Sequence, residues 1–237
     1  MDKFEIRGKN IVNNVGFIHK IEYFYEIEFE EKWNRLYFEV LKYETNSPDI
    51  FVNKVNLLLL AGKIVFDLDN NKRIKSVENY DKIKKKITMD LYMLEIRNPD
   101  LKDILEYIEE KIEKEENFIN FIMEMDFLEF LFGGNQEKKT IEEFYGIDRK
   151  INFEVCVEQK IKNNKEEIIY SIEKSSLNKA LIKYIMNNEE KPEYYLEGKG
   201  EKKYKEGKLL NAKLEIKSGK KGDLEREVYI EIKKVER

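Results

Sequence analysis

Apolar and polar side chains alternate along residues 16–30. One parity carries His19 followed by apolar and aromatic side chains, and the other carries mainly Glu and Lys, interrupted by Phe24. A period of two is typical of a strand with one buried face, so this segment is predicted to be a half-buried antiparallel strand. Further strands are predicted over 33–43, 52–60, 63–68 and 73–77. Residues 1–78 are therefore expected to form an antiparallel meander.

The spacing of apolar residues changes to three and four after residue 80. Ile83, Ile87, Leu91 and Leu94 predict a helix over 81–98. A second helix is predicted from Leu101 to Ile112, and a third over 117–132, apolar on most sides and ended by two glycines. A short helix is expected at 141–145.

Alternation then returns. It predicts strands over 151–161, 167–173, 194–204, 208–217 and 225–235, with a hairpin turn at 163–165 and one helix near 176–189. Strands and helices thus fall in separate blocks, which favours an α+β fold rather than alternating βαβ units. We predict a single domain over 1–237. Its strand-rich parts 1–78 and 148–237 form one curved antiparallel sheet, or two sheets, packed around the central helical segment 79–147.

One hairpin resembles a known pattern. Residues 196–209 contain Gly198, Gly200, Tyr204, Gly207 and Leu209 in the spacing G-x-G-x-x-x-Y-x-x-G-x-L. This spacing is similar to a strand–turn–strand pattern of bacterial half-barrel proteins, which include lipid carriers and lipoproteins. The hairpin at 66–79 is similar to another part of them. The resemblance implies a curved sheet around a helix and assigns no functional residue.

Composition limits the chemistry. Of 237 residues, 44 are Lys or Arg and 48 are Asp or Glu, for a net charge of −4, and there is one His and one Cys. A single His and a single Cys exclude multi-histidine metal sites and internal disulfides. The balanced charge is not a nucleic-acid signature. We expect no cofactor, no bound metal and no nucleic-acid partner.

The N-terminal residues and the overall composition indicate the location and the origin of the protein. The charged N-terminus is not a secretory signal, and the longest apolar stretch is too short and too charged to span a bilayer. A cytoplasmic protein without a membrane span is therefore expected. Many Lys, Ile, Asn and Glu residues with few Ala indicate a low-GC bacterium.

The candidate chemical groups are few. His19 is read as a core or rim histidine rather than a general base, and Cys156 as a structural thiol. Asp67 and Asp69 are read as turn residues rather than oxygen ligands of a cation. The basic runs 84–86 and 202–203 are read as solvated faces. No catalytic residue is predicted.

Two features remain as candidate binding surfaces. Glutamates on one face of the first predicted strand form a row. Their negative charge would be neutralised by lysines of a neighbouring strand or by a basic partner protein. These residues are Glu22, Glu26, Glu28 and Glu30. The apolar helix 117–132 is read as a core helix, with a ligand cavity or partner groove as the alternative.

The absence of a catalytic motif favours a non-enzymatic protein-binding role. Our leading hypothesis is an immunity or antitoxin-type protein that neutralises a basic toxin, with Glu22, Glu26, Glu28 and Glu30 as the contact surface. One alternative is a carrier of a hydrophobic ligand or lipid in a half-barrel cavity. Another is a metal-dependent hydrolase that uses acidic residues.

Overall fold

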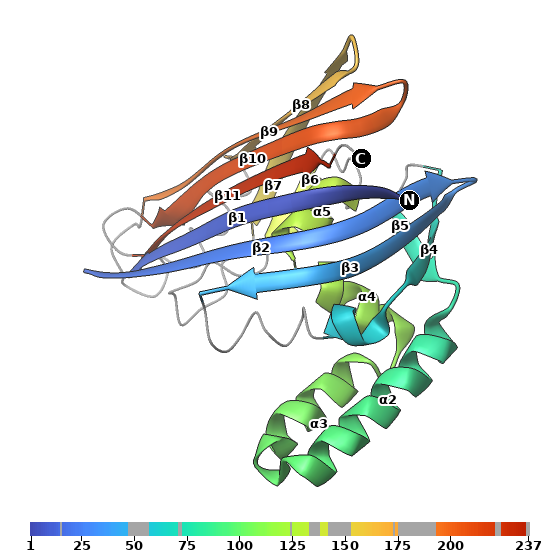
Figure 1. The fold of residues 1–237 in the computed structure, drawn as a ribbon. Helices are drawn as coiled ribbons and strands as arrows, with labels where there is room; N and C mark the ends of the chain where they lie inside the picture. The colour runs from blue at the N-terminus through green and yellow to red at the C-terminus, as the bar shows by residue number, and fades with distance from the viewer. Residues whose placement is uncertain are drawn as a thin grey trace. The chain divides into compact units, whose positions relative to one another are not determined.

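A computed structural model describes residues 1–14, 16–46, 57–70, 73–123, 125–132, 138–141, 153–172, 174, 193–220 and 224–235. It is a mixed α/β fold dominated by antiparallel strands (Figure 1). The chain forms two compact units. The first unit contains residues 1–6, 23–134 and 234–237, and the second contains 7–22 and 135–233. The single-domain assignment stays a prediction.

The strands of the first unit follow one another in the hydrogen-bonded order β5-β4-β3-β2-β1. These are β1 (Asp2–Asn14), β2 (Phe17–Lys32), β3 (Arg35–Thr45), β4 (Ile64–Leu68) and β5 (Ile74–Val77). β1 and β2 also continue into the second unit. The predicted alternation in β2 is confirmed, because Ile21, Tyr23, Tyr25 and Ile27 are all buried. A two-residue turn at Trp33 and Asn34, both with positive φ, leads into β3.

The helices of the first unit include α2 (Tyr80–Arg97), α3 (Lys102–Lys111), α4 (Glu115–Met123) and α5 (Asp126–Phe132), with a short 3-10 turn, η1 (Pro99–Leu101), between α2 and α3. Aromatic rings join α5 to the strands: the Phe127 ring lies 4.9 Å from that of Tyr25, and the Phe132 ring 5.3 Å from that of Phe29. Phe4 of β1 stacks on Phe29 at 4.3 Å. Such ring pairs stabilise beyond their buried area, so this cluster is the core of the unit.

The three helices predicted over 81–132 are helical, but the third is divided in two, and one segment predicted as a strand is helical. The segment predicted as one helix over 117–132 is two helices, α4 and α5, each burying its own set of large side chains. A straight helix that is apolar on most sides would leave part of that surface in water, whereas two shorter helices bury both sets. The run predicted as a strand over 52–60 is helical where it is described, at 57–61, with Leu57, Leu58 and Ala61 buried. A short apolar run does not distinguish strand from helix by periodicity.

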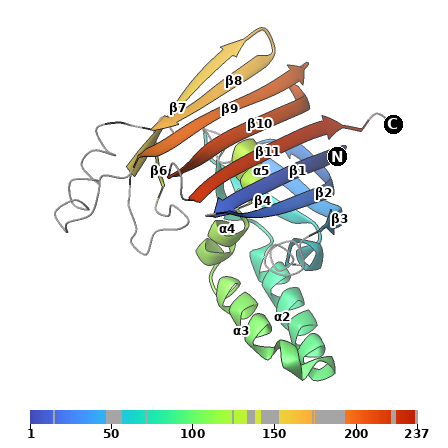
Figure 2. The same ribbon diagram turned by 90° about the vertical axis from the view of Figure 1, so that its left-hand side faces the viewer.

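The second unit contains the strand order β1-β11-β10-β9-β8-β7-β6 (Figure 2). Its strands are β6 (Lys138–Ile141), β7 (Phe153–Lys162), β8 (Lys165–Ile172), β9 (Tyr194–Lys205), β10 (Lys208–Lys220) and β11 (Leu224–Lys234). All pairings from β11 to β6 are antiparallel. Asn163 and Asn164, both with positive φ, form the predicted hairpin turn.

Two predicted helices of this region have different outcomes. The short helix predicted to begin at Ile141 is wrong at its first residue, because Ile141 belongs to β6 and pairs with Phe153 of β7. The rest of that helix, and the helix predicted near 176–189, lie outside the described residues. Within the described residues, no helix is long and apolar enough to span a membrane.

The glycine hairpin that resembles half-barrel proteins has a direct physical explanation. Gly198 of β9 lies between Tyr170 of β8 and Ile216 of β10. A Cβ at residue 198 would lie 2.9 Å from the Tyr170 Cβ and 3.1 Å from the Ile216 Cγ1, closer than carbon atoms pack. Glu206 and Gly207, with φ of 52° and 74°, form the two-residue turn to β10. The pattern therefore fits the needs of a tightly packed hairpin.

Candidate functional site

The predicted glutamate row divides between the two units. In the first unit, Glu26 forms an ion pair with Lys3 of β1, and the hydrogen bond from Lys3 lowers the pKa of Glu26. Glu30 lies 3.8 Å from the amino group of Met1. Glu28 is opposite Glu39 of β3. The charge of Glu26 is thus neutralised by a lysine of a neighbouring strand, which is one of the two interpretations that the sequence left open.

Glu22 belongs to the second unit. It forms an ion pair with Lys20, two residues earlier on the same face of β2, and this hydrogen bond lowers the pKa of Glu22. Lys9 of β1 acts in the same direction from further away. Partner binding by Glu22, Glu26, Glu28 and Glu30 stays a prediction.

Three other candidate groups from the sequence are exposed, half-buried or part of a turn. His19 is exposed near the start of β2, so its place on the apolar parity does not bury it. Cys156 is a free, half-buried thiol opposite Ser171. Asp69 is a turn residue, because its Oδ1 accepts the backbone N–H of Arg73 at 2.9 Å. Among the described residues, no group of three or more His, Cys, Asp or Glu side chains is arranged to hold a metal ion.

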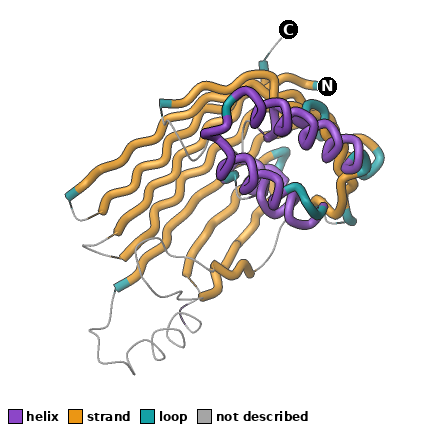
Figure 3. The backbone as a smooth tube through the Cα atoms, turned by 90° about the horizontal axis from the view of Figure 1, so that it is seen from below, coloured by secondary structure: helices purple, strands orange, loops and turns teal. Residues whose placement is uncertain are grey.

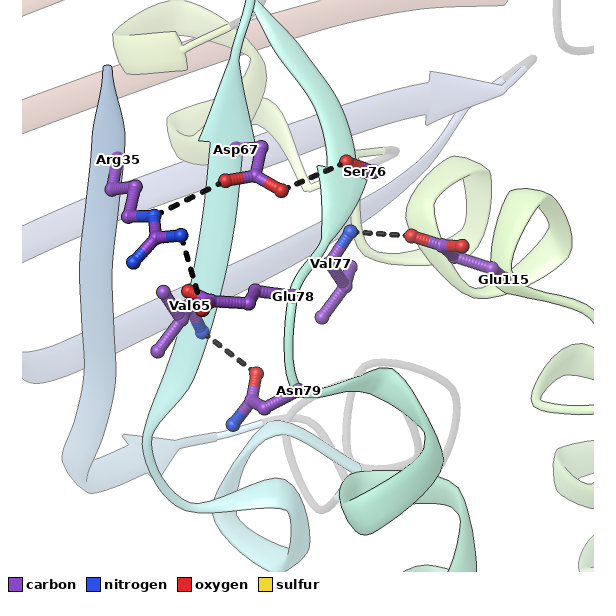
Figure 4. A network of polar contacts seen from close by, with 8 residues as sticks. All are labelled: Arg35, Val65, Asp67, Ser76, Val77, Glu78, Asn79 and Glu115. Carbon is purple, nitrogen blue, oxygen red and sulfur yellow. Dashed lines mark hydrogen bonds and ion pairs between the residues drawn. The ribbon is translucent and has the colours of Figure 1, made fainter. Parts of the chain in front are cut away.

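Asp67 belongs to a polar network on β3, β4 and β5 of the first unit (Figure 4). The Arg35 guanidinium lies 3.4 Å from Asp67 and 3.1 Å from Glu78, and Ser76 Oγ donates to Asp67 at 3.2 Å. A hydrogen bond with Tyr37 and the charge of Glu78 raise the pKa of Arg35. The guanidinium of Arg35 on β3 thus bridges two carboxylates, one on β4 and one just after β5.

Two further side chains connect this network to the helices. The Asn79 side chain accepts the Val65 N–H at 3.0 Å and donates to the Lys63 carbonyl at 2.9 Å, just before α2 begins. A Glu115 carboxylate oxygen of α4 accepts the Val77 N–H (Figure 4). The Glu115 bond satisfies a backbone N–H of the edge strand β5, and the Asn79 bonds connect the residue before α2 to the start of β4.

The second unit contains a buried ion pair. Lys202 of β9 and Glu166 of β8 are each 7% exposed, and their charged groups are 3.5 Å apart. Gln159 and Tyr204 donate to the two Glu166 oxygens at 2.9 and 3.0 Å. Burial lowers the pKa of Lys202, against the opposing charge of Glu166. The sequence prediction that the run 202–203 forms a solvated face is therefore wrong for Lys202, which shares the buried parity of β9.

An exposed apolar surface lies on α2 of the first unit. Its inner stripe, Ile83, Ile87 and Leu91, is buried as predicted. A second apolar stripe lies on nearly the opposite side of the helix, at the spacing i, i+3, i+4, i+7. We call it the outer stripe: Met89, Tyr92, Met93 and Ile96, with exposed fractions of 66, 61, 42 and 59%.

A groove of about 530 Å³ runs beside the outer stripe, between α2 and α3. Met89 and Tyr92 form part of its wall, Thr88 lies between them in the chain, and Glu109 of α3 closes the other side. Lys84 and Lys85 line its other end. The two helices lie side by side as a hairpin (purple in Figure 3). The arrangement is an open apolar surface next to a shallow hollow, a combination suited to binding another chain.

Sequence reasoning missed both of these sites. The outer stripe was visible as a second set of apolar residues at helical spacing in 81–98, but only the stronger inner set was used. The buried parity of Lys202 was visible in the alternation Leu196, Gly198, Gly200, Lys202, Tyr204. In both cases, the side of the element that would be buried depended on partners distant in sequence.

Comparison with known proteins gives no family assignment: no family model and no curated protein matches the chain.

Proposed function

We propose that this chain is a non-enzymatic protein-binding protein of the immunity or antitoxin type, which neutralises a partner toxin. The observation that carries the proposal is the outer stripe of α2. Four apolar side chains at helical spacing, each 42 to 66% exposed, lose free energy in water that contact with a protein surface would recover. Aromatic and Met side chains are also enriched at protein interfaces.

The polar clusters support a binding role over catalysis. Arg35 is held by Asp67 and Glu78, and Lys202 by Glu166, so each charged group already has a partner within the fold. A catalytic acid, base or nucleophile needs an accessible position beside its substrate. The groove lies on the outside of a helical hairpin, which favours a polypeptide segment over an enclosed lipid chain as its occupant.

The acidic face of β2 is the weaker candidate surface. Glu26 and Glu22 are engaged by Lys3 and Lys20, and a basic toxin would have to displace these lysines. The outer stripe needs no such displacement. We therefore assign the main contact to the outer stripe of α2 and treat the glutamates of β2 as a separate, secondary contact.

The test is protection of cells from the product of a toxin gene encoded beside this one. Co-expression is expected to restore growth, and the two purified proteins are expected to bind in isothermal titration calorimetry. The double variant Met89→Asp/Ile96→Asp is expected to lose both effects while keeping its circular dichroism spectrum. Ile161→Asp changes a residue that is 73% exposed on β7 and serves as the matched control. Absence of binding and protection by the unaltered protein would overturn the proposal.

A further inference from the structure

The outward side of the α2–α3 hairpin changes character along its length. Lys82 and Lys85 lie in the first half of α2, on the same side of the helix as the outer stripe. The outer stripe occupies the second half. Asp100 in η1 and Asp103 in the first turn of α3 then follow at the tip of the hairpin, and both are exposed. The order is therefore basic, apolar and acidic.

This order complements itself when a second copy is turned around. We infer that the outer stripe packs against the outer stripe of a second copy of the chain, antiparallel, with a two-fold axis between Tyr92 and Met93. In that register Met89 faces Ile96 of the second copy, and Tyr92 faces Met93. A two-fold interface brings the same patch of both copies together, so each contact is made twice.

Charge selects the antiparallel direction. With the axis between Tyr92 and Met93, Lys85 of one copy lies over Asp100 at the tip of the other. The chain turns back into α3 after this tip, so the register along α2 does not extend to Asp103. A parallel pair would place Lys85 beside Lys85 and Asp100 beside Asp100, which repel. Arg97 and Lys102 also lie near the tip, but Lys102 is held by Glu106 at 3.6 Å.

Other lysines of α2 are already engaged within the first unit. Lys84 Nζ donates to the Glu113 carbonyl and Lys86 Nζ to the Leu60 carbonyl, both at 2.6 Å. In the described part of the chain, no ion pair holds Lys82 or Lys85. Lys85, the lysine that the register needs, is thus one that the fold leaves toward solvent.

The size of the stripe sets the strength of the pair. Met89 and Ile96 are seven residues apart in sequence, which corresponds to roughly 10 Å of helix at 1.5 Å per residue. An interface of this length is smaller than a standard stable one, so the dimer is weak and depends on concentration. The groove beside Met89 and Tyr92 gives room for side chains of the second copy. A toxin bound to the same stripe would displace the second copy, although the pairing itself does not depend on the proposed function.

The first test is sedimentation velocity of the purified chain over a wide concentration series. A monomer–dimer equilibrium is expected, and Met89→Asp/Ile96→Asp is expected to remain monomeric at every concentration. Ile161→Asp is expected to dimerise like the unaltered chain. A monomer at all concentrations, or a dimer unaffected by the double Asp variant, would overturn the inference.

The second test examines the register with charge-reversal variants. Lys85→Asp and Asp100→Lys are each expected to weaken the dimer about tenfold, since each places like charges together. The combined variant Lys85→Asp/Asp100→Lys is expected to restore the original dissociation constant, as in a double-mutant cycle. Additive losses in the combined variant would exclude this register.

A cysteine scan locates the axis independently. In a Cys156→Ser background, Met93→Cys is expected to form a disulfide-linked dimer on oxidation, because residues beside a two-fold axis meet their own copies. Met89→Cys is expected not to, since its two copies lie about 10 Å apart along the helices. Cross-linking at residue 89 and not at residue 93 would contradict the proposed axis. All three tests use the chain alone, so their failure is distinct from a failure to bind a toxin.

Discussion

The two ion-pair clusters of this protein use the same kinds of side chain in opposite environments. In the first unit, Arg35 and its carboxylates Asp67 and Glu78 lie on a half-exposed face, with side-chain exposures of 44, 39 and 42%. In the second unit, the side chains of Lys202 and Glu166 are each only 9% exposed. Exposed ion pairs contribute little to stability because water and salt screen them, whereas a buried charge that loses its partner is costly.

The comparison shows that a high content of charged residues does not indicate which ion pairs are important for stability. A chain with 92 charged residues out of 237 contains both a cluster that can be removed at little cost and a pair that cannot be broken singly. Burial decides between them. The predictions below test that difference, starting from the buried pair.

Lys202→Met is expected to destabilise the protein most, by about 3–5 kcal/mol, because it leaves Glu166 buried without its cation. Chemical denaturation monitored by circular dichroism measures the loss. Lys203→Met, next to it but with a side chain 51% exposed, is the matched control and should change stability far less. The double variant Lys202→Met/Glu166→Leu should recover most of the loss, since both charges are gone. Equal effects at residues 202 and 203 would remove the contrast between the two clusters.

The second prediction concerns pH and Tyr170, which lies over Gly198 near the buried pair. Burial, together with the charge of Glu166, raises the pKa of Tyr170 from 10.0 to about 12. The folded protein therefore keeps this proton at pH values where the unfolded chain has lost it. The stabilisation is fully present below pH 10 and is lost as pH rises towards 12, a change of about 2 kcal/mol.

Tyr170→Phe tests this alkaline loss. The free energy of unfolding of the variant should decline less between pH 10 and 12 than that of the unaltered chain. Lys202 acts in the opposite direction. Because its pKa is lowered in the folded protein, the free-energy cost of burying its charge falls as rising pH removes the proton. Since both proteins contain Lys202, the difference between them isolates the tyrosine. Parallel pH profiles would show that Tyr170 titrates normally.

Gly198→Ala is expected to cost about 1–3 kcal/mol, because the new methyl group would overlap Tyr170 and Ile216 from both sides. Gly207→Ala provides the comparison. Its Cβ would meet nothing within 4 Å, but its φ of +74° strains any other residue. Combining Gly198→Ala with Ile216→Ala, which removes the Cγ1 atom nearest on that side, should reduce the loss at residue 198 when compared with Ile216→Ala alone. No such rescue is expected at residue 207.

The smallest effect is expected from Arg35→Ala. The guanidinium is open to solvent, so its removal should shift the denaturation midpoint within the scatter of repeated measurements at physiological salt. A clear destabilisation that disappears at high salt would instead show that the network in Figure 4 holds β3 and β4 together electrostatically.

The fold was predictable where one face of an element is uniformly apolar. The buried sides of β2 and α2 follow directly from the alternation at 21–27 and from the spacing of Ile83, Ile87 and Leu91. β1 was missed because its buried parity runs Phe4, Ile6, Gly8, Asn10, and the last two do not read as core residues. Asn10 is buried because its side-chain oxygen accepts a hydrogen bond from Arg226, a partner 216 residues away in the chain. Sequence spacing contains no record of such a contact.

The candidate site was less accessible to sequence reasoning for the same reason. The outer stripe is exposed because no element of the first unit described by the structure covers that side of α2. The local sequence pattern indicates that the stripe exists but not whether it is buried. The glutamates of β2 attracted attention as a row, but their meaning depended on Lys3, which lies on the undetected strand β1.

One feature of the first unit bears on how the protein is made. It includes residues from both extremes of the chain: the Lys3 carbonyl accepts a backbone hydrogen bond from Val235 at 2.8 Å, and Asp2 pairs with Lys234 at 2.8 Å. This unit therefore cannot complete its contacts until residue 235 has emerged from the ribosome. During synthesis, the hydrogen-bonding edge of β1 waits for a strand more than two hundred residues away, and contacts of such long range form slowly. The pairing of β1 with β11 is therefore a late step in the folding of the nascent chain, and until then the edge of β1 is open to other strands.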